Sequence, residues 1–322
     1  MRLTIKTRLR DFIITTDDWI FAVADYTHQS GIRCILRYVP DKEGERLKNG
    51  VRYRKLDFDD AFTFMKKHRP SWVKDVHIVP FDQVKQVLNP VRRIPDLIDT
   101  SPEAAVIVQV LSDGEIPLSQ MGITGSHLPG LTNKTSDIDF IVYGKYWFKA
   151  RDLIAKAKKT GGAICEINDE MWHRIYNKRI PATTFEEFIL HEKRKGNRGM
   201  VKNTYFDLLY VRDWNDIKPL PTGVDIKHKK IEAMVTNADY AFDAPSIYKI
   251  DHPEIKYVLS YTHTYAGQAR RGEQIEAEGM VEQIGKIKRL VVGTSREPKN
   301  EWIRSLTLIQ ETAQLRCAEN NW

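Results

Sequence analysis

Two aspartates, Asp137 and Asp139, have the residue type and spacing that most directly suggest chemistry in this sequence. They open an apolar run that reads as a β-strand, and alternate residues of a strand point to the same face of a sheet. Two carboxylates on one face repel each other and are costly to desolvate, so a bound cation best explains the pair. Oxygen ligands select a hard ion such as Mg²⁺, which takes further ligands from water and substrate phosphates.

Gly125 and Ser126 lie upstream of these carboxylates, and ten residues separate Ser126 from Asp137. Glycine has no β-carbon to block a phosphate, and serine offers a hydroxyl group beside free backbone N–H groups. If Ser126 opens a helix, the positive end of the helix dipole adds to the attraction for an anion. We therefore predict that Gly125 and Ser126 bind nucleotide phosphates.

Residues 121–140 closely resemble the motif of the DNA polymerase β-like nucleotidyltransferase superfamily, especially its small prokaryotic members. In that family a strand ends in Gly-Ser, a short helix follows, and Ser-Asp-x-Asp opens the next strand. Here Gly125-Ser126, Gly130 and Ser136-Asp137-Ile138-Asp139 match in residue type and in spacing. The resemblance extends over roughly residues 103–213, about a third of the chain.

The resemblance also implies a third catalytic carboxylate on a later strand, and Asp207, in the apolar run 205–211, is the candidate. It implies that Asp137, Asp139 and Asp207 hold two Mg²⁺ (or Mn²⁺) ions, and that Asp207 helps to activate an acceptor hydroxyl group. The implied reaction transfers a nucleoside monophosphate from an NTP, ATP or another, and releases pyrophosphate. The alternative for Asp207 is an ion pair with an arginine inside the sheet.

A basic run at residues 191–202 lies just upstream of Asp207. Such runs are often solvated helix ends, and the position just before the Asp207 strand makes contact with phosphate or nucleic acid an equal alternative, for which Arg198 and Lys202 are the nucleotide-binding candidates. The net charge of +7 and pI near 9.1 favour a polyanionic partner, so RNA is the expected acceptor. Two alternatives stay open: a protein or small-molecule acceptor, and a nucleic-acid-binding protein on the same fold without catalysis.

Three regions must position these residues, and together they predict an α/β and α+β multidomain protein. Residues 1–97 form an α+β module of unknown role, and residues 98–218 form the nucleotidyltransferase core with a mixed sheet and helices. Residues 219–322 are β-rich, with the pattern of a small OB-type barrel and a C-terminal helix. The expected helices are 57–67, 82–88, 102–111, 147–159 and 185–195, and the expected strands include 12–15, 19–23, 32–39, 121–124, 137–142 and 205–211. A second Asp-x-Asp pair, Asp57 and Asp59, opens the first helix and is interpreted as capping.

Composition excludes several other classes of protein. Apolar stretches are far shorter than the roughly 20 residues that span a bilayer, and the N-terminus lacks the pattern of a signal peptide. Cys34, Cys165 and Cys317 stand singly and form no zinc framework. We therefore expect a cytoplasmic protein without a membrane partner. No sequence feature selects one NTP base or an oligomeric state.

Overall fold

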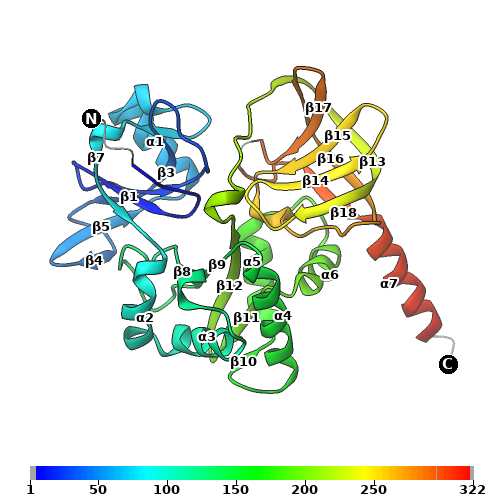
Figure 1. The fold of residues 1–322 in the computed structure, drawn as a ribbon, viewed down its shortest axis with the longest axis horizontal. Helices are drawn as coiled ribbons and strands as arrows, with labels where there is room; N and C mark the ends of the chain where they lie inside the picture. Colours follow the sequence, from blue (N-terminus) through cyan, green and yellow to red (C-terminus); the bar gives the residue numbers. More distant parts are fainter. Residues whose placement is uncertain (1–4, 295, 320–322) are drawn as a thin grey trace. The chain divides into compact units, whose positions relative to one another are not determined.

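The chain divides into two compact units (Figure 1). The computed structural model describes residues 5–294 and 296–319, and over these residues the fold is mixed α/β with three sheets and seven α-helices. Unit 1 comprises Met1–Glu166 and Asn197–Leu220, and unit 2 comprises Ile167–Gly196 and Pro221–Trp322. The chain leaves unit 1 close to the predicted boundary at 218, whereas the segment 167–196, assigned to the core from sequence, belongs to unit 2.

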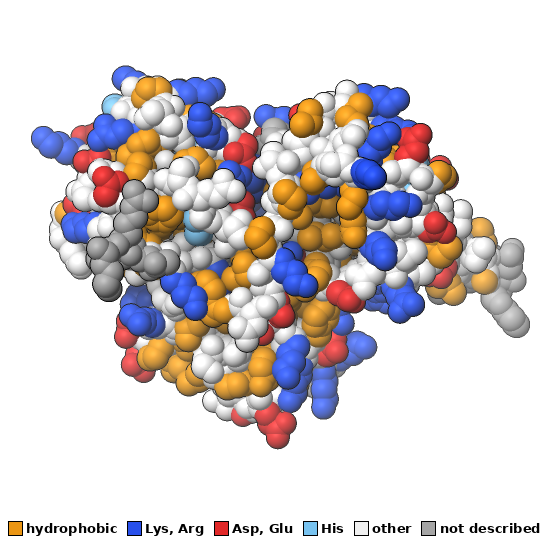
Figure 2. Space-filling view, turned by 45° about the horizontal axis from the view of Figure 1, so that its top comes forward, with side chains coloured by type: hydrophobic (Ala, Val, Ile, Leu, Met, Phe, Trp, Pro, Cys, Tyr) orange, Lys and Arg blue, Asp and Glu red, His pale blue; other side chains and the backbone are white. Residues whose placement is uncertain are grey.

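Basic side chains are dispersed over the surface drawn in Figure 2, where they alternate with acidic and uncharged groups. The net charge of +7 is therefore not concentrated into one patch on that face. None of the helices in the described part of the chain is long and apolar enough to cross a membrane.

The first sheet of unit 1 has seven strands in the order β4-β5-β3-β2-β1-β7, and β6 pairs with β3 (Figure 1). Its strands are β1 Phe12–Thr15, β2 Ile20–Val23, β3 Ile32–Pro40, β4 Arg46–Lys48, β5 Val51–Lys55, β6 His77–Val79 and β7 Val84–Leu88. Helix α1 (Phe58–His68) packs against β3 and contributes Ala61 and Met65 to the core. Asp57 caps α1 by accepting a hydrogen bond from Asp60 N at 2.9 Å, which confirms the capping interpretation.

The helix predicted at residues 82–88 is wrong, because the chain there forms strand β7. β7 pairs antiparallel with β1, so that Val87 lies opposite Ile13 and Val84 opposite Thr15. Partnership with a neighbouring strand decides the conformation of so short an apolar segment, and its β-branched valines suit a pleated surface.

The second sheet of unit 1 carries the predicted carboxylates and has the order β10-β11-β12-β9-β8. Its strands are β8 Met121–Ile123, β9 Ile138–Tyr143, β10 Ile164–Cys165, β11 Arg198–Val201 and β12 Thr204–Val211, with helices α2 Ile94–Thr100, α3 Pro102–Asp113 and α4 Tyr146–Lys159. β9 and β12 run parallel, and the other pairs are antiparallel. Helix α4 packs against both, with Trp147 Nε1 donating to the carbonyl of Leu208 at 3.3 Å and the Trp147 ring edge-on to Tyr210.

Unit 2 combines a six-stranded sheet with three helices. Its elements are α5 Asp169–Arg179, α6 Phe185–Lys195, β13 Val224–Tyr240, β14 Ser246–Asp251, β15 Ile255–Ser260, β16 Gln274–Ile284, β17 Ile287–Val292, β18 Trp302–Ser305 and α7 Leu306–Glu319. The order is β13-β14-β15-β17-β16-β18, and β13 also pairs with β16, so five strands close an uneven ring. Residues 219–322 contain the expected strands and a C-terminal helix, but the compact unit also includes 167–196, and the OB-type barrel form stays a prediction.

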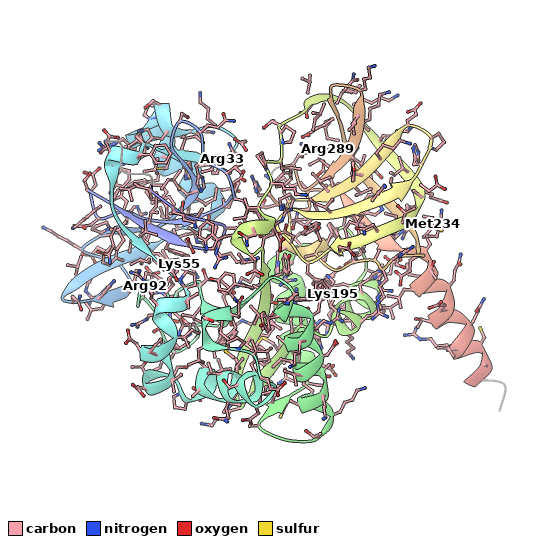
Figure 3. The ribbon with its side chains drawn as sticks, in the orientation of Figure 1. Arg33, Lys55, Arg92, Lys195, Met234 and Arg289 are labelled. Atoms are coloured by element: carbon pink, nitrogen blue, oxygen red, sulfur yellow. The ribbon has the colours of Figure 1, made fainter. Side chains whose placement is uncertain are left out.

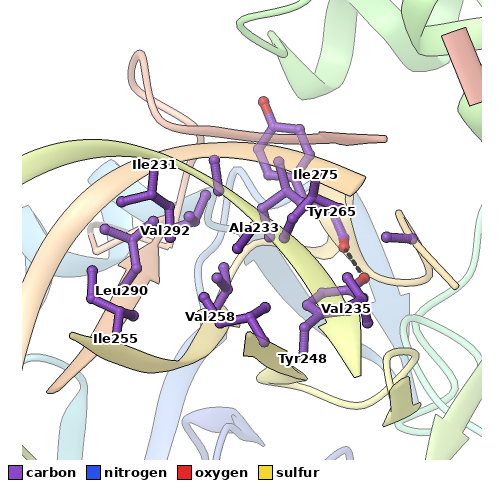
Figure 4. Packing of buried hydrophobic residues seen from close by; sticks show 14 of the residues in the cluster. Ile231, Ala233, Val235, Tyr248, Ile255, Val258, Tyr265, Ile275, Leu290 and Val292 are labelled. Carbon is purple, nitrogen blue, oxygen red and sulfur yellow. Dashed lines mark hydrogen bonds between the residues drawn. The ribbon is translucent and has the colours of Figure 1, made fainter. Parts of the chain in front are cut away.

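The interior of unit 2 is apolar and includes paired charges. Figure 4 shows the cluster around Val235, Val258 and Tyr248, where the Tyr248 hydroxyl donates to the carbonyl of Tyr265 at 2.9 Å. Two buried cations labelled in Figure 3 have acidic partners: Arg289 pairs with Glu282 at 2.6 Å, and Lys195 pairs with Glu192. Buried charges of this kind must be paired because their desolvation is costly.

Candidate functional site

The Gly-Ser loop and the two aspartates meet where β8 ends and β9 begins. The strands are antiparallel, with Ile123 opposite Phe140, and Thr124 N donates to the carbonyl of Asp139 at 2.9 Å. Gly125 has φ +62°, and a β-carbon at this residue would lie 2.1 Å from Asp139 Oδ2. The absence of a side chain at Gly125 therefore allows the Asp139 carboxylate to lie directly against the backbone of the loop.

The loop after Gly125 consists of consecutive turns, so the helix expected to begin at Ser126 is wrong. Leu131 N donates to the carbonyl of Ser126 at 2.9 Å, and Gly130, at φ +71°, donates to the carbonyl of His127 at 3.2 Å. Without a helix there is no aligned row of peptide dipoles at Ser126. Anion attraction at this loop must therefore come from individual N–H groups, the Ser126 hydroxyl and bound cations.

Asp207 lies next to Asp139 in the sheet. The parallel pairing of β9 with β12 places Asp207 in register with Asp139, and neighbouring strands are about 4.8 Å apart. Both side chains point to the face opposite Tyr210, whose ring contacts Trp147 of α4. The structure thus brings Gly125, Asp139 and Asp207 together on the face of the sheet that α4 does not cover.

The carboxylate of Asp207 is engaged by neighbouring side chains. Arg198 Nε donates to Oδ2 at 3.1 Å, and Asn197 Nδ2 donates to Oδ1 at 3.0 Å. Arg198 lies directly opposite Asp207 on β11, and both side chains are buried. The structure therefore shows the alternative interpretation of Asp207, an ion pair with an arginine. In this structure the Arg198 side chain binds the Asp207 carboxylate, so it is not available to bind a nucleotide.

This arrangement fits a metal ion at Asp137 and Asp139 better than a centre of three carboxylates. Both are half-buried acids at the start of β9, and their oxygens suit Mg²⁺. Among the described residues, no group of three or more His, Cys, Asp or Glu side chains converges to hold a metal. Asp207 would have to exchange its bonds with Arg198 and Asn197 for an ion to become a third ligand.

Lys202, the other basic candidate, lies away from Asp207. It occupies the turn between β11 and β12 with φ +51°, and its Nζ is 3.4 Å from Glu103 Oε1 at the start of α3. The Arg198–Asp207 pair lies several residues along the same hairpin. The structure thus brings Arg198 to Asp207, and it places Lys202 with α3.

The first sheet packs on the Gly-Ser loop. This contact was not predicted from the sequence. Leu128 and Leu131 of the loop are buried in a cluster with Phe12, Ile20, Tyr38 and Tyr53. No local sequence signal could have revealed this packing, because it joins segments that are far apart in the chain. The sheet face therefore fixes the shape of the loop from one side.

Arg46 of β4 makes the polar part of the same contact. Its Nη1 donates to the carbonyl of Leu131 at 3.3 Å and to the Ser136 hydroxyl at 3.2 Å, so it joins the middle of the loop to the residue that precedes Asp137. Burial raises the pKa of Tyr38; the charges of Arg37 and Arg46 oppose this rise, and the charge of Asp139 adds to it. Tyr38 and Arg46 therefore lie within electrostatic reach of the candidate site.

One relative spans nearly the whole chain. The uncharacterized protein MJ1086 of Methanocaldococcus jannaschii is 37% identical over an alignment that covers 93% of this chain and 99% of the archaeal protein. No protein-family model matches the chain, and no solved structure matches it. The similarity therefore includes both units and is not confined to the segment around Asp137.

Proposed function

This chain belongs to the family of the archaeal protein MJ1086, and we propose, from the geometry around Asp139, that it is a metal-dependent nucleotidyltransferase. The proposal rests on the close approach of three residues. Asp139 lies against Gly125, which has φ +62°, and Asp207 is in register with Asp139 on the neighbouring strand. Adjacent carboxylates beside a loop with backbone N–H and hydroxyl donors suit metal-assisted transfer of a phosphate-bearing group.

Each residue of the site has a separate role in the proposed reaction. Gly125 and Ser126 bind the β- and γ-phosphates of the NTP through backbone N–H groups and the Ser126 hydroxyl, while the missing side chain of Gly125 leaves room for the Asp139 carboxylate. Asp137 and Asp139 would hold Mg²⁺ or Mn²⁺, which would supply charge neutralisation at the α-phosphate that is transferred with the nucleoside and at the departing pyrophosphate. Asp207 is placed to orient the acceptor hydroxyl once its carboxylate is released from Arg198. Arg46 holds the second half of the loop through its hydrogen bonds to Leu131 and Ser136.

RNA is the acceptor that we propose, on the basis of the net charge of +7 and the β-rich unit 2. Affinity for such an acceptor should fall steeply as salt concentration rises, because bound counterions are released on contact. A protein or small-molecule acceptor would show a weaker dependence.

The test is transfer of label from each α-labelled NTP to total cellular RNA or protein extract, with Mg²⁺ or Mn²⁺ present. We expect transfer by the natural chain and a loss of at least about a hundredfold in Asp137→Asn and Asp139→Asn, because each change removes a charged metal ligand. Asp59→Asn is the matched control, since it alters an exposed Asp-x-Asp pair at the start of α1 and should leave transfer unchanged. The labelled fraction identifies the acceptor class.

The ion pair between Arg198 and Asp207 favours one second candidate, a nucleic-acid-binding protein on this fold that does not catalyse. An arginine fixed on the third carboxylate leaves fewer acidic groups for metal ions. This candidate predicts no label transfer with any NTP, together with RNA binding that is equal in the natural chain and in Asp137→Asn. That combination of results would sink the transferase proposal.

A further inference from the structure

A polar cavity of about 370 Å³ lies in unit 1, between the junction of α2 with α3 and the loop from β8 to β9. Its wall includes Ser136 and Ile138, whereas Asp137 and Asp139 do not line it. Because successive strand residues point to opposite faces, Ile138 and the cavity lie on the other face of β9 from Asp139. The cavity is therefore separate from the carboxylates of the proposed reaction.

The wall of this cavity is rich in neutral hydrogen-bonding groups. Hydroxyl and amide side chains come from Thr100, Ser101, Thr132, Asn133, Ser136 and Thr204. Gly130 adds bare backbone at φ +71°. Such groups both donate and accept, as sugar hydroxyls require, and the volume lies in the range of small-molecule sites.

Basic side chains supply a positive wall. Arg93 and Lys134 line the cavity, and the Arg93 guanidinium pairs with Asp96 at 2.8 Å. Glu103, the acid on the wall, is 3.4 Å from Lys202 Nζ. The negative charges of Asp96 and Glu103 are thus each balanced by a neighbouring cation. Lys134 forms no ion pair among the described residues.

Arg93 also lies within electrostatic reach of two further basic residues, Lys48 and the wall residue His127. Burial lowers the pKa of Lys48, and the charge of Arg93 lowers it further. The pKa of His127, another wall residue, is lowered by the same two causes in the same order. The Lys48 ammonium and the Arg93 guanidinium repel each other, and a bound anion relieves that repulsion, whereas the lowered pKa leaves the His127 ring mainly uncharged at neutral pH.

We propose that this cavity binds a nucleoside phosphate, free or as the end of an RNA chain, with its phosphate on Arg93 and Lys134 and its sugar on the hydroxyl and amide wall. The inference does not depend on catalysis of nucleotidyl transfer. Such a ligand contacts the outer side of the loop that continues through Ser136 into Asp137. Occupancy of the cavity would thus brace the segment that presents the catalytic carboxylates.

The experiment is calorimetric titration of the full chain with AMP in buffer without divalent ions. AMP should bind at least about tenfold more tightly than adenosine, because a phosphate gains charge-assisted hydrogen bonds to the cations. Lys134→Gln should weaken AMP binding about tenfold for the same reason. Arg92→Gln is the matched control: Arg92, labelled in Figure 3, is the exposed neighbour of Arg93, does not line the cavity, and should leave AMP affinity unchanged.

Two further ligands identify the occupant. A single-stranded RNA hexamer with a 5′ phosphate that binds more tightly than AMP assigns the cavity to a chain end, and weaker RNA binding assigns it to a free nucleotide.

Equal affinities for AMP and inorganic phosphate would overturn the assignment to a nucleoside. The proposal also fails if neither AMP nor RNA binds, if adenosine matches AMP, or if Lys134→Gln and Arg92→Gln lose equal affinity. No metal and no transfer enter this assay, so its failure is distinguishable from failure of the transferase proposal.

Discussion

At the scale of single residues, Gly125 and Asp139 form the contact on which the candidate site depends. A β-carbon at Gly125 would come within 2.1 Å of Asp139 Oδ2. Both residues could be selected as candidates from their types alone, because a glycine at a strand end and an aspartate in an apolar strand are unusual. The partner of Asp207 could not be selected in the same way, since an arginine and a metal ion both satisfy a buried carboxylate.

Gly125→Ala tests this contact. We expect it to destabilise unit 1 and to abolish label transfer, because the new methyl group displaces the Asp139 carboxylate. Thermal unfolding and the transfer assay measure the two effects. Gly161→Ala is the control, with φ +67° and open space around the Cα. It should cost about 1 kcal/mol of stability from the left-handed backbone and leave transfer unchanged. Equal effects of the two substitutions would contradict the role given to the contact.

At the scale of elements, strongly periodic segments were predictable and short apolar ones were not. Helix α6 has the predicted bounds, Phe185–Lys195, since Thr184 caps it and Gly196 ends it in the left-handed conformation. The helix prediction for β7 is wrong, and β11 lies in the basic run 191–202, for which no strand was predicted. Both depend on neighbouring strands for their hydrogen bonds, which a local pattern does not reveal.

Leu131→Ala tests whether the first sheet supports the catalytic loop. Leu131 is fully buried against that sheet, so its truncation should cost about 2–5 kcal/mol of unfolding free energy and reduce transfer. Leu118→Ala is matched in chemistry but 46% exposed, and it should alter neither quantity. Urea unfolding of both variants gives the comparison. A Leu131→Ala chain that matches Leu118→Ala in stability would show that the loop does not rely on the sheet.

At the scale of the whole molecule, unit 1 joins two sheets through a buried polar region around Arg8. Arg8 lies over the Tyr143 ring at 3.7 Å and donates to the carbonyl of Arg212 at 3.0 Å, and its N–H donates to Asp11 Oδ2. Burial raises the pKa of Asp11 from 3.8 to about 7, although the hydrogen bond and charge of Arg8 oppose the rise. The packing of the two sheets therefore makes an acidic group retain its proton.

This pKa predicts how stability depends on pH. Folded Asp11 keeps a proton that the unfolded chain releases above its ordinary pKa of 3.8, so its contribution is present at low pH and is lost as pH rises to about 7. Between pH 5 and pH 8 the loss should be about 3 kcal/mol. Urea unfolding at the two pH values should show that Asp11→Asn lacks this loss, while the exposed Asp59→Asn retains it. A parallel pH dependence in natural chain and Asp11→Asn would refute the assignment.

The sequence by itself determined which residues were candidates for chemistry and which strands carry them. Gly125, Ser126, Asp137 and Asp139 stood out because their types are costly or unusual beside apolar strands, and strand periodicity is a local property. Only the tertiary structure decided that Arg198 pairs with Asp207, and that Arg46 and the first sheet support the loop. The Arg46–Leu131 contact joins residues 85 positions apart. Such contacts arise from the packing of distant segments, and the types of the residues involved do not specify them in advance.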